Sequence, residues 1–131
     1  MDSRLRQLVR DRAQDRCEYC RVPQKAIHTK LHLEHIIALQ HTGKSLEENL
    51  AMACDRCNLY KGTNLSGIDP DSGEIVRLFD PRSDIWDQHF ALIAEEIIGR
   101  TPTGRATSLL LRFNSENRLR LRRKLLMKGH W

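Results

Sequence analysis

The sequence predicts an α+β fold, in which a metal-clamped unit of two short strands and a helix precedes further strands and helices. Two Cys-x-x-Cys pairs, Cys17/Cys20 and Cys54/Cys57, have the ligand type and spacing of a tetrahedral zinc site. Between them, apolar residues alternate as they do in a strand. After residue 65 the composition shifts toward Gly, Asp and Pro. We therefore expect a core over residues 1–65 and an extension over 66–131 packed on it.

The composition permits only a modest core. The chain has 131 residues, 5% aromatic and 30% charged. A metal cross-link would help, because metal binding to the folded state adds directly to folding free energy. The formal charge of +5 favours a polyanionic partner, although solvated lysines and arginines give the same balance.

The start of the chain is charged throughout and contains no apolar run typical of a secretory signal. No stretch approaches the roughly 20 apolar residues that span a bilayer. We therefore expect a cytoplasmic protein with no membrane partner. In a reducing compartment the four cysteines are expected to bind zinc rather than to form disulfides.

The first half of the chain gives these elements in order. A helix is expected over 3–14, where Ser3 can act as cap and apolar residues repeat at helical spacing. A strand follows within 27–39, then a loop over 40–49 that turns at Gly43. Residues 50–54 form a second strand or a turn. A short helix then starts at 55 and ends near Gly62.

In the second half, residues 67–74 and 80–84 are expected to form turns on either side of a strand over 75–79. Residues 89–101 are rich in strand formers and predict a hairpin. Thr101-Pro102 then starts a helix. Ser115 can start a last helix over 116–128, although "RLRLR" within it fits strand and helix periodicity equally. Both helices are basic.

Four side chains between and after the cysteine pairs could perform catalysis. His35 can take a proton from water near neutral pH, and Glu34 offers a hard anionic oxygen for Mg2+. Asn58 adds a neutral amide oxygen as a second metal ligand, and Asn49 can fix a loop backbone. Neighbours on a strand face opposite ways, so Glu34 and His35 can share a site only at a strand end or a distortion.

Four segments, "CEYC", "LEHIIALQHTG", "EENLAMAC" and "CNLYKG", occur in this order. Together they resemble the HNH endonucleases, which have the ββα-metal (His-Me finger) fold. The resemblance covers roughly residues 12–65. The segment that begins "GIDPDSGEIVRLFDPR" is similar to an extension found in small stand-alone bacterial proteins of this type.

The resemblance implies a phosphodiester hydrolase that cleaves DNA with Mg2+ or another divalent ion. His35 corresponds to the general base, Glu34 and Asn58 to the ligands of the catalytic metal, and Asn49 to the residue that buttresses the loop. The chain departs from the common pattern in having Glu34 for Asp, Leu39 for a proline and Thr42-Gly43 for Gly-Gly. None of these changes removes a chemical group that the mechanism needs.

Further residues are candidates for nucleic-acid contact: His32, Lys61, Arg118, Arg122 and Lys124. His32 can equally be a plain strand histidine, and the basic tail can equally be the solvated face of amphipathic helices. DNA is the expected partner, RNA remains open, and no organic cofactor is expected. Two other functions stay open: a non-catalytic zinc module that binds nucleic acid, and a protein-interaction adaptor.

Overall fold

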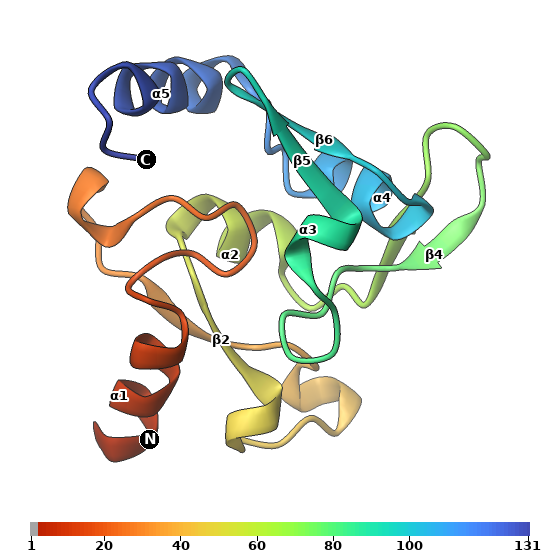
Figure 1. The fold of residues 1–131 in the computed structure, drawn as a ribbon. Coiled ribbons are helices and arrows are strands. Elements are labelled where there is room, and N and C mark those ends of the chain that lie inside the picture. Colours follow the sequence, from red (N-terminus) through yellow and green to blue (C-terminus); the bar gives the residue numbers. More distant parts are fainter. Residues whose placement is uncertain (1–2) are drawn as a thin grey trace. The chain divides into compact units, whose positions relative to one another are not determined.

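We analysed a computed structural model of the chain, which describes residues 3–131. The α+β class is confirmed, with short helices and small antiparallel sheets (Figure 1). The chain divides into two compact units, residues 1–64 and 65–131. Each unit has its own antiparallel strand pairing, helices and buried side chains.

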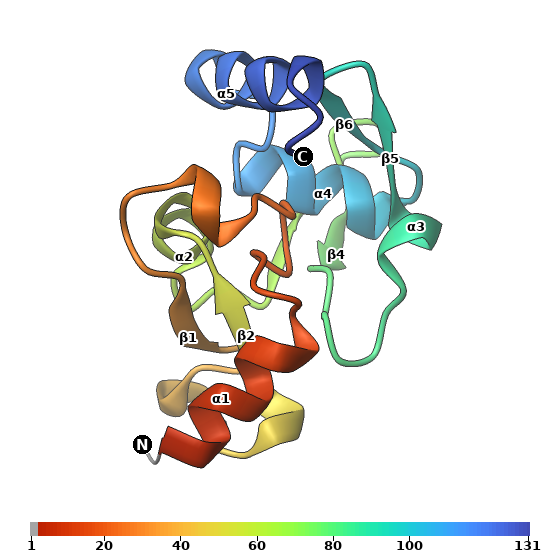
Figure 2. The same cartoon turned by 60° about the vertical axis from the view of Figure 1, so that its left-hand side comes forward.

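The first unit is built on one antiparallel strand pair. β1 (His32–His35) pairs with β2 (Leu50–Ala53). All four residues of β2 are buried, and α2 (Asp55–Lys61) follows after one residue. The helix α1 (Ser3–Arg12) packs against β2 (Figure 2). This two-strand, one-helix order is the ββα arrangement expected from the sequence.

Three single-turn 3-10 helices connect these elements: η1 (Gln24–Ala26), η2 (Leu39–His41) and η3 (Glu47–Asn49). The loop that carries the last two passes very close to its own backbone at Gly43. A Cβ atom at this position would lie 1.8 Å from the carbonyl oxygen of Ile37. Only glycine fits there, which explains the turn residue in this loop.

β1 is much shorter than the strand expected within residues 27–39. Side chains satisfy the flanking backbone instead of a strand partner. The Gln24 side chain accepts a hydrogen bond from the Leu31 amide, and the Asn49 side chain bonds both the amide and the carbonyl of Ile37. The alternating apolar residues thus extend beyond the four residues of β1 that pair with β2.

The second unit contains two hairpins. β3 (Ser66–Ile68) pairs with β4 (Ile75–Arg77), and β5 (Phe90–Ile93) pairs with β6 (Glu96–Gly99). The hairpin expected within 89–101 is therefore confirmed. β3 was not expected, because its three residues lie at the edge of a stretch that has the composition of a turn.

Three helices complete this unit: α3 (Trp86–His89), α4 (Pro102–Leu110) and α5 (Glu116–Met127). α4 contacts β3, β4 and β6. Its start is as expected, since the Thr101 side chain accepts a hydrogen bond from the Gly104 amide and Pro102 lies in the first turn. The ambiguous "RLRLR" segment is helical within α5. α3 has only four residues, too few for a helical pattern to be recognised in the sequence.

Arg122 was expected to contact nucleic acid, and the structure corrects this. Its side chain is 2% exposed and donates hydrogen bonds to the carbonyl oxygens of Glu95 and Phe113. These bonds tie α5 to the β5–β6 turn and to the segment before α5. A guanidinium buried in this way satisfies carbonyls of the fold and does not face a phosphate in solvent.

We predict that Arg122→Ala lowers the free energy of unfolding by about 3 kcal/mol, because it leaves two buried carbonyls unpaired. Lys124→Ala, on the exposed side of the same helix, should change it by less than about 0.5 kcal/mol. Urea unfolding of both variants measures the difference. Equal, small effects would show that Arg122 does not stabilise the fold.

Candidate metal centre and active site

The four cysteines converge on one buried point. Their sulfur atoms lie within 4.8 Å of one another, and none of the four forms a disulfide. The Sγ atoms of Cys20 and Cys54 are 3.7 Å apart. Sulfurs bound to one tetrahedral zinc ion at about 2.3 Å would be about 3.8 Å apart. The cluster therefore has the dimensions of a zinc site, as the spacing of the pairs predicts.

Local backbone geometry forms each cysteine knuckle. The first turns tightly, since the Arg21 amide bonds the Cys17 carbonyl and Arg21 itself adopts a left-handed conformation, with φ of 69°. The Cys20 amide also donates to the Cys17 sulfur. The second knuckle uses a helix start, with Cys54 just before α2 and Cys57 in its first turn.

Burial raises the pKa of the Cys17 and Cys57 thiols well above their ordinary value. The pKa of Cys54 is instead lowered, chiefly by its hydrogen bond with Cys17. As free thiolates, four buried sulfurs this close together would repel one another. A divalent cation among them supplies the opposite charge that makes the thiolate form favourable.

Glu34 lies on the face of β1 that is turned toward α2. Its carboxylate is 6% exposed, and Oε1 lies 2.8 Å from Nζ of Lys61. The hydroxyl of Tyr19 donates a hydrogen bond to the same oxygen at 3.2 Å. Oε2 is buried without a hydrogen-bond partner in the described part of the chain. Burial raises the pKa of Glu34, and Lys61 and Tyr19 oppose this rise.

His35 is the last residue of β1 and is half-buried. Its Nε2 lies 2.8 Å from the hydroxyl oxygen of Ser45, in the loop between the strands. Asn49 braces this loop: its Oδ1 accepts from the Ile37 amide, and its Nδ2 donates to the carbonyls of Ile37 and Lys44. The imidazole thus points toward a loop segment that side-chain hydrogen bonds hold in place.

Asn58 lies on α2, half-buried, one turn after Asp55 and one turn before Lys61. Asp55 contacts Nε2 of His32, and Lys61 contacts Glu34, so this stripe of the helix faces β1. Residues three apart share a helix face. Asn58 therefore faces the same strand surface. Hydrogen bonds from His32 and Thr29 lower the pKa of Asp55.

Within residues 3–131, no hydrogen bond joins any two of Glu34, His35 and Asn58. Glu34 and Asn58 belong to the surface between β1 and α2, whereas His35 contacts Ser45 in the loop. His35 ends the strand, and a strand end is where neighbouring side chains can converge. That Glu34 and His35 act on one site stays a prediction.

Lys61 was expected to contact phosphate, and the structure corrects this. The side chain is 2% exposed, pairs with Glu34 and donates to the carbonyl oxygen of Ile36 at 2.9 Å. His32 is exposed, but it already contacts Asp55. Arg118 bonds the carbonyl of Leu111 and is half-buried. Lys124 is the expected phosphate contact that remains exposed on the helix surface.

Sequence reasoning missed two residues of this site. Tyr19 lies between two zinc ligands, where its spacing gives no sign that it reaches Glu34. Ser45 lies in a polar loop that contains other hydroxyl and charged residues. The one available signal was that Tyr19 is the only aromatic residue within a knuckle. A tyrosine hydroxyl that becomes buried usually finds a hydrogen-bond partner.

The strand pair, the helix and the four-cysteine centre define a ββα-metal domain. The family model described as HNH endonuclease matches residues 17–64 of the chain. The resemblance expected from the motifs is therefore confirmed, and it indicates a nuclease domain of the HNH type. Comparison with curated proteins and with solved structures gave no match.

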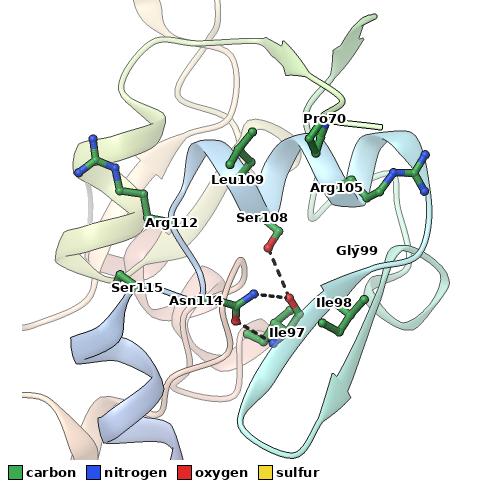
Figure 3. Close-up of a pocket in the computed structure, with 10 residues that line it drawn as sticks. All are labelled: Pro70, Ile97, Ile98, Gly99, Arg105, Ser108, Leu109, Arg112, Asn114 and Ser115. Atoms are coloured by element: carbon green, nitrogen blue, oxygen red, sulfur yellow. Dashed lines mark hydrogen bonds between the residues drawn. The ribbon is translucent and has the colours of Figure 1, made fainter. Parts of the chain in front are cut away.

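The second unit has a surface concavity of about 530 Å³ between β6 and α4 (Figure 3). Its polar side chains are used by the fold. Asn114 bonds both the amide and the carbonyl of Ile97, and Arg105 pairs with the buried Asp69. The remaining lining is mostly apolar, including Ile98 and Leu109. The described residues around this concavity include no group positioned for catalysis.

No helix among residues 3–131 combines the length and the apolar character needed to cross a membrane.

We predict about one zinc ion per chain in protein purified without chelator, and its loss in Cys20→Ser. Because zinc binding contributes to folding free energy, Cys20→Ser should also unfold the first unit at a markedly lower temperature. Metal analysis and thermal unfolding measure both effects. Lys25→Ala, exposed between the two knuckles, serves as control and should keep its zinc. Metal-free wild-type protein would contradict the assignment.

Proposed function

We propose that the domain is a metal-dependent endonuclease that hydrolyses DNA phosphodiester bonds. One observation carries the proposal beyond the family match. Glu34 presents a carboxylate oxygen, Oε2, that is buried and has no partner among the described residues. An ionised oxygen in such a place is costly unless a cation meets it. Mg2+ prefers carboxylate oxygens of this kind.

The residues present fit such an ion. Glu34 would provide the anionic ligand from β1, and Asn58 the neutral amide oxygen from α2, the helix that contacts β1. Two protein ligands leave room for water and substrate oxygens, as Mg2+ requires. When bound, the ion would offset negative charge that develops on the phosphate and the leaving oxygen.

His35 acts as the general base. A neutral imidazole accepts a proton on one nitrogen only when the other carries the hydrogen. Ser45 lies at Nε2, so a hydrogen bond donated from Nε2–H to its hydroxyl leaves Nδ1 to take the proton from the attacking water. Asn49 holds the loop that carries Ser45 and so fixes the orientation of the ring.

The proposed substrate is DNA, with RNA as the alternative. The basic C-terminal helix favours a polyanionic substrate. The residues that could contact it differ from those expected from the sequence. α5 and its C-cap residue expose Arg120, Lys124 and Lys128 at four-residue spacing, on one side of the helix. Arg120 forms an ion pair with the exposed Glu116, an interaction of small energy. These three cations replace Arg118 and Arg122 as candidates for phosphate contact.

A non-catalytic zinc module remains the rival function. Such a module would need the cysteines and exposed cations but not an unpaired buried carboxylate oxygen beside a positioned histidine. Cleavage assays with plasmid, with and without Mg2+ or EDTA, separate the two. Binding without any divalent-dependent cleavage on DNA or RNA would favour the module.

His35→Ala should lower single-turnover cleavage by at least about a hundredfold, because it removes the group that takes the proton from water. Zinc content and DNA affinity should remain those of the wild type. His28→Ala, at an exposed histidine of the first unit, is the control and should cleave normally. Rates across pH for the three proteins measure the effect. Equal rates for His35→Ala and wild type would rule out His35 as the base.

Replacing Arg120, Lys124 and Lys128 with Ala should reduce the slope of log affinity against log salt by about one for each phosphate that α5 no longer binds. The chemistry should be unaffected at saturating protein. A matched triple variant in the first unit, Arg6, Lys25 and Lys30 to Ala, removes the same charge from other exposed sites. If both triples change the slope equally, DNA is not bound preferentially by α5.

A further inference from the structure

The first zinc knuckle reaches the active-site carboxylate directly. Cys17 and Cys20 are the two ends of the four-residue knuckle, and Tyr19 lies between them with its side chain fully buried. Its hydroxyl donates to Oε1 of Glu34 at 3.2 Å. Burial, the negative charge of Glu34 and the nearby sulfurs raise the pKa of this phenol well above its ordinary value. A phenol carries its proton near neutral pH, so Tyr19 donates this hydrogen bond to the carboxylate.

The other middle residue of the knuckle, Glu18, docks the knuckle on the sheet. Its amide donates to the Met52 carbonyl, and its carboxylate accepts from the Met52 amide, both at 2.8 Å. Met52 is next to Ala51, which pairs with Glu34 across the ladder. Glu18 thus fixes the knuckle to Met52, the residue next to the strand partner of Glu34.

Two donors bind one oxygen of Glu34 and leave the other free to meet a cation. Tyr19 in the knuckle and Lys61 on α2 both bond Oε1. With Oε1 fixed in this way, the carboxylate cannot rotate without breaking one of these bonds. Oε2 is then held in one direction, and it is this oxygen that has no partner in the described residues.

We propose that Tyr19 is a positioning residue that orients Glu34 toward the catalytic metal ion, so that the zinc knuckle and the active site are mechanically coupled. This inference rests on the proposed function, since it takes Glu34 as a metal ligand. Residues that hydrogen-bond a metal ligand typically alter metal affinity about 10- to 100-fold when they are removed. Lys61 shares this role but also neutralises Glu34, so Tyr19 is the cleaner residue to test.

The test measures Mn2+ binding to the full chain without DNA, by electron paramagnetic resonance. Tyr19→Phe keeps the ring and removes only the hydroxyl, and we expect about a tenfold higher Kd for Mn2+ with zinc content unchanged. The chain has one other tyrosine, Tyr60, half-buried on α2 in the same unit. Tyr60→Phe is the matched control and should bind Mn2+ as the wild type does. An unchanged Kd in Tyr19→Phe overturns the proposal.

A second measurement covers the case in which Tyr19→Phe loses zinc. Incorporating 3-fluorotyrosine into the Tyr60→Phe protein labels Tyr19 alone and leaves its hydroxyl in place. Titration with Mg2+ should shift this single fluorine resonance, with the concentration dependence of metal binding. If Mn2+ binds but the resonance does not move with Mg2+, the coupling does not exist.

The two hypotheses fail in different ways. A wild-type protein that neither binds Mn2+ nor cleaves contradicts the proposed nuclease function. A wild-type protein that binds Mn2+ and cleaves, with Tyr19→Phe equal to it in both, contradicts only the role of Tyr19.

Discussion

The convergence of four sulfurs on one point is the constraint on which the first unit depends. The two cysteine pairs are separated by 33 residues, and these residues contain β1, β2 and the loop between the two strands. Joining the ends of such a segment costs loop-closure entropy that a small core with few aromatic residues offsets poorly. A metal ion bound by the four sulfurs would supply this closure and would also fix α2 against the strands, since Cys54 and Cys57 flank its start.

The knuckle "CEYC" serves a different purpose at each position. Cys17 and Cys20 contribute sulfurs to the metal centre, Glu18 bonds both backbone groups of Met52, and Tyr19 bonds Glu34. Four consecutive residues therefore link a metal centre, a sheet and a candidate catalytic carboxylate. The short turn makes this possible, because it directs neighbouring side chains toward separate partners within one small volume.

Sequence alone predicted the convergence of the four cysteines, the ββα order, and the start of α4 at Thr101-Pro102. These depend on residue type and local spacing, which sequence contains. It did not predict that Lys61 and Arg122 are buried, because the burial of a cation depends on partners distant in the chain: Glu34 for Lys61, and the Glu95 carbonyl for Arg122. It also overestimated the length of β1, since apolar alternation does not reveal that Gln24 and Asn49 take over the backbone hydrogen bonds.

The buried group of Tyr19, Glu34 and Lys61 bears on the choice between nuclease and passive module. Taking a carboxylate and an ammonium out of water costs several kcal/mol per ion, and well-packed apolar residues of similar volume are often at least as stable. A module that needed only a rigid scaffold could use such apolar residues instead. The unit has nonetheless buried both ions and left Oε2 without a partner among the described residues. A cation that binds this oxygen offsets part of the cost, which supports a metal-dependent nuclease over a passive module.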